Sequence, residues 1–258
     1  CTSRGLGDVY KRQSIDILLD EKTEVNDLRP YIDTIRRVKS ASEIQYMQEA
    51  ASIASSAHEK AMRNSRPGMG EWEIQAMVEG HFMSSQSQWS FPSIVGGGDN
   101  ATVLHYKDNN QVIGSGDLVL VDAGCEVSGY ASDITRTWPV NGRFSQPQRE
   151  IYNLVLKAEL AGIEACQPGM PWVSMHEAVC VTIAEGLIEL GVLNCTLEDA
   201  LGRVAGKPGV FEGQIRNFFM HGTGHFLGLD VHDVGGGRQG DPNSCLLYTS
   251  DAADDRCC

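Results

Sequence analysis

Two aspartates, Asp122 and Asp133, each touch a short apolar run that is rich in β-branched residues, and a turn-rich segment lies between the runs. The runs and the turn are residues 118–121, 134–140 and 126–129. This order predicts a β-hairpin. Folding it about the Val127/Ser128 point places Asp122 directly opposite Asp133, with Cβ atoms about 5 Å apart. Carboxylates that close repel unless a cation lies between them, so a divalent metal ion would fit the pair. Aspartates are also common at strand ends and turns, and the hairpin by itself favours that ordinary structural interpretation.

Three of the seven histidines fall within twelve residues, at His221, His225 and His232. The glycines between them disfavour a helix, and the alternation of Leu and Val predicts a strand over residues 227–232. Imidazole and carboxylate ligands together suit Mn, Fe, Co or Zn, and a majority of carboxylates favours Mn²⁺. A single histidine is more often a core or surface residue, but three beside an aspartate pair indicate a metal site. The remaining helical histidines are expected to lack polar neighbours and to be ordinary core or surface residues: His58, His81 and His176.

Helices are expected on both sides of this chemistry, because apolar residues recur at helical spacing over residues 43–63, 71–84, 147–166 and 175–190. Ser42, with Gln45 three residues later, is the expected N-cap of the first helix. These ranges form two pairs of helices, and the dipeptide Pro-Gly follows the first helix in each of them. Two helix–turn–helix units of similar design suggest an internal duplication around a shared sheet.

The composition excludes several classes of protein. The 258 residues are 41% hydrophobic and 21% charged, which is typical of soluble globular proteins. A net charge of −13 argues against nucleic-acid or anionic-membrane partners. No apolar run is long enough for a membrane helix, and no signal peptide opens the chain. The interior cysteines, which form no close pair, are expected to be reduced thiols of a cytoplasmic protein: Cys125, Cys166, Cys180 and Cys195.

Three motifs carry a resemblance to a known family. Residues 104–106 (LHY), 122–142 (DAGCEVSGYASDITRTWPVNG) and 221–233 (HGTGHFLGLDVHD) resemble the pita-bread metallopeptidases, specifically the Xaa-Pro aminopeptidase (aminopeptidase P) group. The similarity extends from about residue 37 to about residue 236. It implies an α+β fold in which duplicated helix–strand halves surround a curved antiparallel sheet.

The resemblance also implies roles for individual residues. Asp122, Asp133 and His225 would bind two divalent ions, with Asp133 bridging both. His105, His221 and His232 would position the substrate and stabilise the tetrahedral intermediate. The ions, Mn²⁺ before Co²⁺, Zn²⁺ or Fe²⁺, would activate a bridging hydroxide. The implied substrate is a peptide with proline in second position, and the full-length protein is expected to be a homo-oligomer.

The chain departs from the family pattern in one respect. Two glutamate ligands are expected after the histidine motif, yet the only acids after His232 are aspartates in unsuitable segments: Asp233, Asp241, Asp251, Asp254 and Asp255. This polypeptide is therefore expected to bind metal poorly and to be inactive. Residues 38–243 are predicted to be an incomplete catalytic domain, and residues 14–37 a remnant of an N-terminal domain and linker. Residues 1–13 and 244–258 lack periodicity and are interpreted as terminal sequence that does not belong to the natural protein.

Other readings of the motifs stay open. Proline dipeptidase has a very similar histidine segment, and the spacing of residues 168–176 also fits it. Residues 122–126 and 135–138 are more similar to the aminopeptidase. Methionine aminopeptidase lacks the LGLDVHD continuation. A non-catalytic binding module, or a metal-free creatinase-like amidinohydrolase, fits less well because the candidate ligands Asp122, Asp133 and His225 are present.

Overall fold

The computed structural model describes residues 26–235, and the chain divides into two units between Ile35 and Arg36. The first unit is described here only from residue 26, and helix α2 (Arg29–Arg37) begins in it and crosses the boundary. The terminal segments 1–13 and 244–258 lie outside the described residues, and the predicted domain boundaries stay predictions. Within the described part, no helix has the length and apolarity to cross a membrane.

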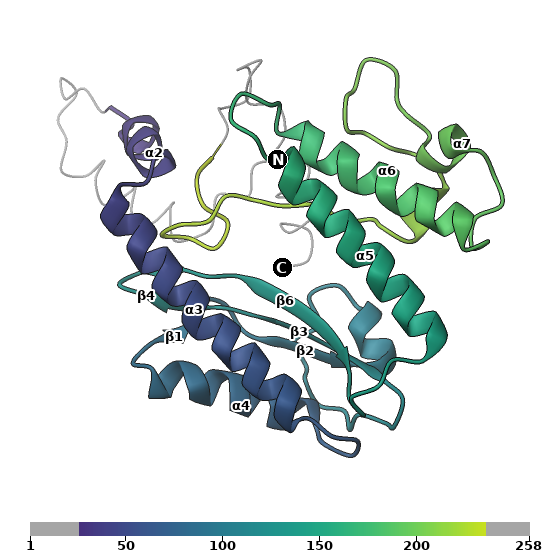
Figure 1. The fold of residues 1–258 in the computed structure, drawn as a ribbon. Coiled ribbons are helices and arrows are strands. Elements are labelled where there is room, and N and C mark those ends of the chain that lie inside the picture. The colour runs from purple at the N-terminus through teal and green to yellow at the C-terminus, as the bar shows by residue number, and fades with distance from the viewer. Residues whose placement is uncertain (1–25, 236–258) are drawn as a thin grey trace, which may run out of the picture. The chain divides into compact units, whose positions relative to one another are not determined.

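Helices α3 (Ala41–Asn64) and α4 (Glu71–Ser84) open the second unit. The expected cap at Ser42 is wrong. Ser40 is the N-cap, because its hydroxyl accepts from the amide of Glu43 while the Glu43 carboxylate accepts from the amide of Ser40 at 2.6 Å. The buried face of α3 is made mainly of alanines: Ala50, Ala54, Ala57 and Ala61. Small side chains let this helix pack closely along the sheet, as Figure 1 shows.

Two three-stranded antiparallel sheets pack beside these helices (Figure 1). The first has the order β2-β3-β6: β2 (Ile94–Gly97), β3 (Leu118–Ala123) and β6 (Ile134–Pro139). The second has the order β1-β4-β5: β1 (Gln88–Trp89), β4 (Cys125–Val127) and β5 (Tyr130–Ala131). Alternate residues of β3, Val119, Val121 and Ala123, are buried against α3 and α4. The other face of β3, which carries Asp122, is only partly buried.

The hairpin forms as expected, but its register is shifted. Ser128 and Gly129 are the two central residues of the turn, because β4 pairs with β5 through Val127 and Tyr130. Both have positive φ, 53° and 83°, as a type I′ turn requires, and this favours glycine at the second position. Because the turn is centred one residue later than predicted, each residue of β3 pairs with a residue two positions later in the chain than predicted. Asp122 therefore lies opposite Thr135, and the expected pairing of Asp122 with Asp133 is wrong.

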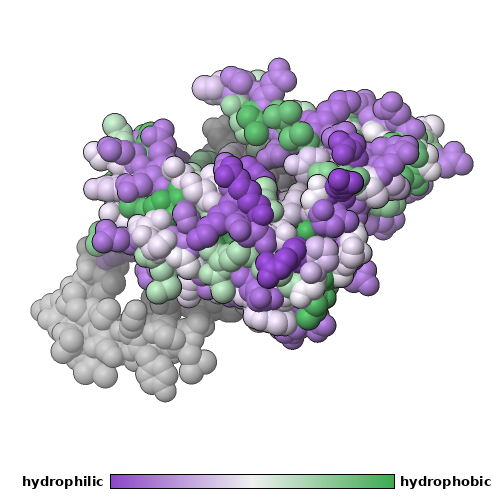
Figure 2. Space-filling view, turned by 60° about the horizontal axis from the view of Figure 1, so that its bottom comes forward, coloured by the Kyte–Doolittle hydropathy of each residue, from purple (hydrophilic) through white to green (hydrophobic). Residues whose placement is uncertain are grey.

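The second pair of helices begins and ends within two residues of expectation. It consists of α5 (Gln146–Ala165) and α6 (Val173–Glu189), which lie side by side in Figure 1. The short α7 (Leu197–Leu201) and the 3₁₀ helix η2 (Gln214–Asn217) follow, and a second 3₁₀ helix, η1 (Gly98–Thr102), comes after β2. Leu154 and Ala158 of α5 are buried, whereas three other apolar residues of this helix are exposed: Ile151, Val155 and Ile163. Hydrophobic patches are interspersed among hydrophilic residues on the face drawn in Figure 2.

The segment around the histidines is a loop, so the strand expected over residues 227–232 is wrong. Alternating leucines and valine do not by themselves supply a neighbouring strand. The backbone bonds mostly within the segment: Gly228 donates to Asp230, and Asp233 donates to Phe226. Among the described residues, one backbone bond links it to another element, from the amide of Ala131 to the carbonyl of Gly228 at 2.8 Å. That bond ties the loop to β5. The four interior cysteines are free thiols, as expected.

The junction between β3 and β4 predicts a large effect of one methyl group. A Cβ at Gly124 would overlap the carbonyl oxygen of Ser132, so the Gly124→Ala backbone must shift. We expect the free energy of unfolding to fall by about 1–3 kcal/mol or more in urea denaturation. Gly80→Ala is the matched control, since Gly80 is helical and its Cβ would meet no atom within 4 Å. It should be neutral or stabilising by up to about 1 kcal/mol. Equal losses in both variants would contradict the packing described.

Candidate metal centre

The two aspartates lie on the hairpin, Asp122 within β3 and Asp133 just before β6. Asp122 pairs with Thr135 of β6, and Asp133 lies two residues before Thr135, so the two carboxylates are diagonal neighbours. Burial, together with the negative charge of Asp133, raises the pKa of Asp122 to about 7. Among the described residues, the buried Oδ1 of Asp122 has no hydrogen-bond partner. A buried carboxylate oxygen without a donor is costly, and a cation would satisfy it.

His225 faces the second aspartate from the histidine loop. Its Nε2 lies 2.9 Å from Oδ2 of Asp133, and its Nδ1 donates to the carbonyl of Phe226 at 3.0 Å. Burial opposes the charge on both groups, but their mutual hydrogen bond raises the pKa of His225 and lowers the pKa of Asp133. A positive charge is therefore favoured between Nε2 of His225 and Oδ2 of Asp133, where the proton lies. The Phe226 carbonyl fixes the ring so that Nε2 points at the carboxylate.

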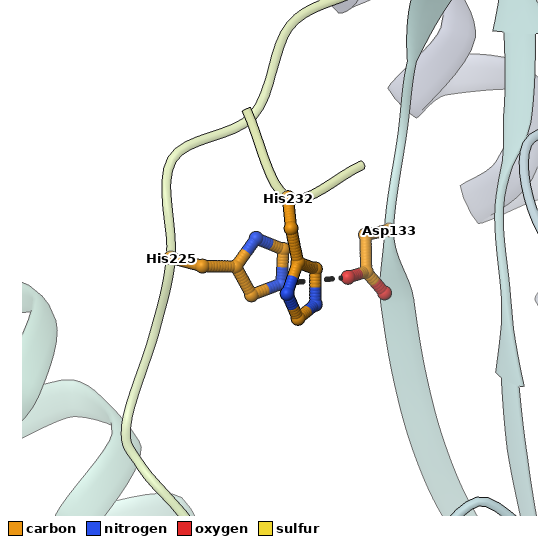
Figure 3. Close-up of side chains that lie close together, drawn as sticks. All are labelled: Asp133, His225 and His232. Carbon is orange, nitrogen blue, oxygen red and sulfur yellow. Dashed lines mark hydrogen bonds and ion pairs between the residues drawn. The ribbon is translucent and has the colours of Figure 1, made fainter. Parts of the chain in front are cut away.

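His232 completes a cluster with these two residues (Figure 3). One ligand atom from each of Asp133, His225 and His232 lies within 4.8 Å of the others. The imidazoles of His225 and His232 stack at 3.9 Å with an angle of 28° between the rings. His232 was expected to position substrate, and the structure places it beside the expected metal ligands. Because His232 is exposed, it can either bind a metal ion or contact the substrate.

The remaining two candidate histidines form a second group. The rings of His105 and His221 meet edge to face, with centroids 6.0 Å apart and an interplanar angle of 81°. The Nδ1 of His221 donates to the carbonyl of Gly222 at 2.8 Å. Asp133, His225 and His232 thus form one group, and His105 and His221 form a second. Asp122 interacts with Asp133 but lies outside the group whose ligand atoms are all within 4.8 Å of one another. Their individual functional roles stay predictions.

Residues that fix the histidine loop escaped the sequence reasoning. His176 of α6, expected to lack polar company, has its Nδ1 2.6 Å from the hydroxyl of Thr223, between His221 and His225. Burial lowers the pKa of His176, which favours the neutral ring. At the other end of the loop, the buried carboxylate of Asp233 forms ion pairs with Arg36 and Lys39.

These contacts could not be read from the sequence, because the partners of each pair lie far apart in the chain. His58 fits the structural role expected of it. It is buried, and its Nδ1 bonds the carbonyl of Ala54 at 2.9 Å.

The donor set fits a divalent metal ion. Two carboxylates and one imidazole are ligands that Mn²⁺, Fe²⁺, Co²⁺ and Zn²⁺ share. The 2.9 Å between Nε2 of His225 and Oδ2 of Asp133 is compatible with both atoms binding one ion, since such ligands lie about 2.0–2.2 Å from the metal. The partnerless Oδ1 of Asp122 offers a third donor. The described residues can therefore hold one side of a metal centre.

The raised pKa of Asp122 predicts a pH-dependent effect of Asp122→Asn in metal-free protein. The pKa of this carboxyl is about 4 in the unfolded chain and about 7 in the folded protein. Its stabilising contribution is therefore complete below about pH 4 and is lost as the pH rises through about 7. Asn cannot ionise. We therefore expect Asp122→Asn to raise the Tm relative to wild type at pH 8 and to change it less at pH 5. The control Asp99→Asn, at an exposed position, should show no such trend. A larger rise in Tm for Asp122→Asn at pH 5 than at pH 8 would contradict the raised pKa of Asp122.

The sequence profile of metallopeptidase family M24 matches residues 45–249. Xaa-Pro aminopeptidases of Haemophilus influenzae and Escherichia coli K12 are 45% identical over 214 residues and 41% identical over 210 residues. The alignments cover 83% and 81% of this chain but 48% and 46% of the relatives. The chain thus spans about half the length of the curated relatives it matches.

Solved structures give the same result for the fold. The Pseudomonas aeruginosa aminopeptidase PepP superposes with a TM-score of 0.82 at 38% identity, over 92% of this chain and 54% of that one. Zinc-substituted E. coli aminopeptidase P in complex with product gives 0.77 at 40% identity, over 86% and 48%. The expected α+β pita-bread fold is confirmed for the part that these structures cover.

Proposed function

The chain belongs to metallopeptidase family M24, and on that premise we propose that it is the metal-binding part of an Xaa-Pro aminopeptidase. The longer protein would remove the N-terminal residue from peptides that have proline in second position. One observation carries the proposal: among the described residues, the buried Oδ1 of Asp122 has no hydrogen-bond donor, and its carboxylate interacts with Asp133, which in turn bonds His225. A structural aspartate would have found a donor, whereas a metal ligand needs none.

Asp122, Asp133 and His225 would hold the divalent ions, two in the complete centre. The carboxylate majority favours Mn²⁺, with Co²⁺, Zn²⁺ or Fe²⁺ as alternatives. When bound, such ions lower the pKa of water and polarise a scissile carbonyl. The chain's own contribution is to orient the ligands. Phe226 accepts from Nδ1 of His225, which directs Nε2 toward the centre.

His105, His221 and His232 would act on the substrate. Because Nδ1 of His221 donates to Gly222, its Nε2 remains to accept a proton or, once protonated, to donate to a developing oxyanion. His105 packs edge to face against it, so the two rings would face the same part of the substrate. His232 stacks on His225 and is exposed, which suits contact with the peptide.

Proline dipeptidase remains the second candidate, favoured by the similar histidine motif. The aminopeptidases among the relatives support the first reading. The acidic composition and the free cysteines support a cytoplasmic location. The homo-oligomeric state of the longer protein stays a prediction.

The longer protein should cleave Xaa-Pro-Xaa tripeptides when supplied with Mn²⁺, and Asp133→Asn should abolish this cleavage. The substitution removes an anionic ligand that also orients His225. We expect at least about a 100-fold loss of kcat/KM, of the size seen when groups that orient or stabilise the transition state are lost. The control Asp99→Asn removes an exposed carboxylate and should keep full activity. Unchanged activity in Asp133→Asn would refute the metal centre, and cleavage of Xaa-Pro dipeptides alone would favour proline dipeptidase.

The 258-residue polypeptide itself should not hydrolyse these peptides. Only three of the ligands implied by the family resemblance, Asp122, Asp133 and His225, lie among its described residues. Few ligands and few compensating charges imply weak binding of Mn²⁺. Isothermal titration with Mn²⁺ should give little heat, and product formation should match the buffer blank. Robust turnover by this polypeptide would show that other residues complete the centre.

A further inference from the structure

Glu71, the first residue of α4, holds together three segments that are separate in the sequence. It is fully buried, and its two carboxylate oxygens accept four hydrogen bonds. Oε1 accepts from the amide of Gly97 at 2.8 Å and from Nδ2 of Asn100 at 2.9 Å. Oε2 accepts from the hydroxyl of Tyr106 at 2.9 Å and from the amide of Gln111 at 3.0 Å. None of these four donors carries a charge, and together they offset the cost of burying the carboxylate.

The four donors flank and span the loop that carries His105. Gly97 ends β2, Asn100 lies in η1, and Gln111 lies beyond the loop. Tyr106 is the residue directly after His105, and its hydroxyl also accepts from Nδ2 of Asn100 at 2.9 Å. The Glu71 amide donates in turn to the carbonyl of Gln111 at 2.9 Å. One carboxylate thereby fixes the start, the middle and the end of the segment from 97 to 111.

The backbone of His105 needs such support. Its φ of 53° lies in the left-handed region, which is unfavourable for a residue with a side chain. A strained conformation persists only where its surroundings over-determine it, and such strain is frequent at functional sites. The bond from Tyr106 to Glu71 acts one residue away from the strained position. It therefore fixes the direction in which the His105 ring leaves the backbone, toward His221.

We propose that Glu71 is a positioning residue for His105, which acts through Tyr106 to keep the His105 imidazole facing His221. This inference rests on the proposed function, because the role of His105 in catalysis is itself part of that proposal. Nothing in it requires Glu71 to touch a substrate or a metal ion. The carboxylate serves as a fixed, buried acceptor. A neutral side chain cannot replace it, because both oxygens face N–H or O–H donors and an amide would turn an NH₂ group toward one pair.

The first test measures the loop itself in this polypeptide. Tyr106→Phe removes only the hydroxyl next to His105, and Glu71→Gln removes acceptance at one oxygen. Both should increase amide hydrogen exchange over residues 98–111 at least about tenfold. Both should also shift the ¹³C-labelled His105 ring resonances.

The matched control for this test is Glu73→Gln. Glu73 lies in the same first turn of α4, but it accepts a single bond, from the amide of Gly70, which glutamine can also accept. It should leave both signals unchanged. Unchanged exchange and ring resonances in Tyr106→Phe, in a protein that is folded by circular dichroism, would overturn the proposal even if Glu71→Gln fails to fold.

The second test is a double-mutant cycle in the longer, Mn²⁺-loaded protein. Tyr106→Phe should lower kcat for an Xaa-Pro tripeptide about 10- to 100-fold with little change in KM, since a small misplacement of a catalytic group has that effect. In a His105→Ala background the same substitution should change kcat less than about twofold, because the group it positions is gone. A loss of kcat that is equal in both backgrounds would show that Glu71 and Tyr106 act on stability alone.

The two tests separate failure of this inference from failure of the proposed function. If His105→Ala leaves tripeptide cleavage unchanged, the catalytic role of His105 is wrong and so is its positioning by Glu71 for catalysis. The exchange and resonance measurements would still decide whether Glu71 orders the loop. If His105→Ala is inactive while Tyr106→Phe has full kcat, the proposed function stands and the inference about Glu71 is refuted.

Discussion

Two carboxylates that repel each other lie on one antiparallel strand pair, and the register of β3 against β6 holds them there. The paired strands place Asp122 opposite Thr135, with Asp133 two residues before it. The buried core under β3 and the closing turn at Ser128 and Gly129 maintain this register. A slip of one residue would turn Asp122 into the core and Val121 out of it. The hydrophobic face of β3 therefore fixes the position of the polar site on its other face.

The histidine loop has no ladder of its own and is held by side chains from other elements. Thr223 bonds His176 of α6, and Asp233 pairs with Arg36 and Lys39. The amide of Ala131 ties the same loop to the hairpin at Gly228, close to the aspartates. These contacts bring an imidazole to the carboxylates across 92 residues of sequence. Stability and function oppose each other here, since the burial that positions Asp122 also disfavours its charge.

Periodicity and turn residues were enough to predict the four long helices and the hairpin, because both signals are local. The predicted pairing of Asp122 with Asp133 was wrong by two residues on the partner strand. The turn is centred on Ser128 and Gly129, which adopt positive φ, and the apolar runs alone do not locate that centre. The strand expected over residues 227–232 was wrong because alternation cannot supply a partner strand. Glu71 and His176 were missed because their polar partners lie 26 to 47 residues away.

The central claim is that Asp122, Asp133 and His225 bind a divalent ion. Anomalous diffraction at the manganese edge, from crystals of the longer protein grown with Mn²⁺, tests it most directly. The account predicts a peak about 2.0–2.3 Å from a carboxylate oxygen of Asp122, a carboxylate oxygen of Asp133 and Nε2 of His225. A peak that leaves Oδ1 and Oδ2 of Asp122 both unbound, or that lies between His105 and His221, would contradict it.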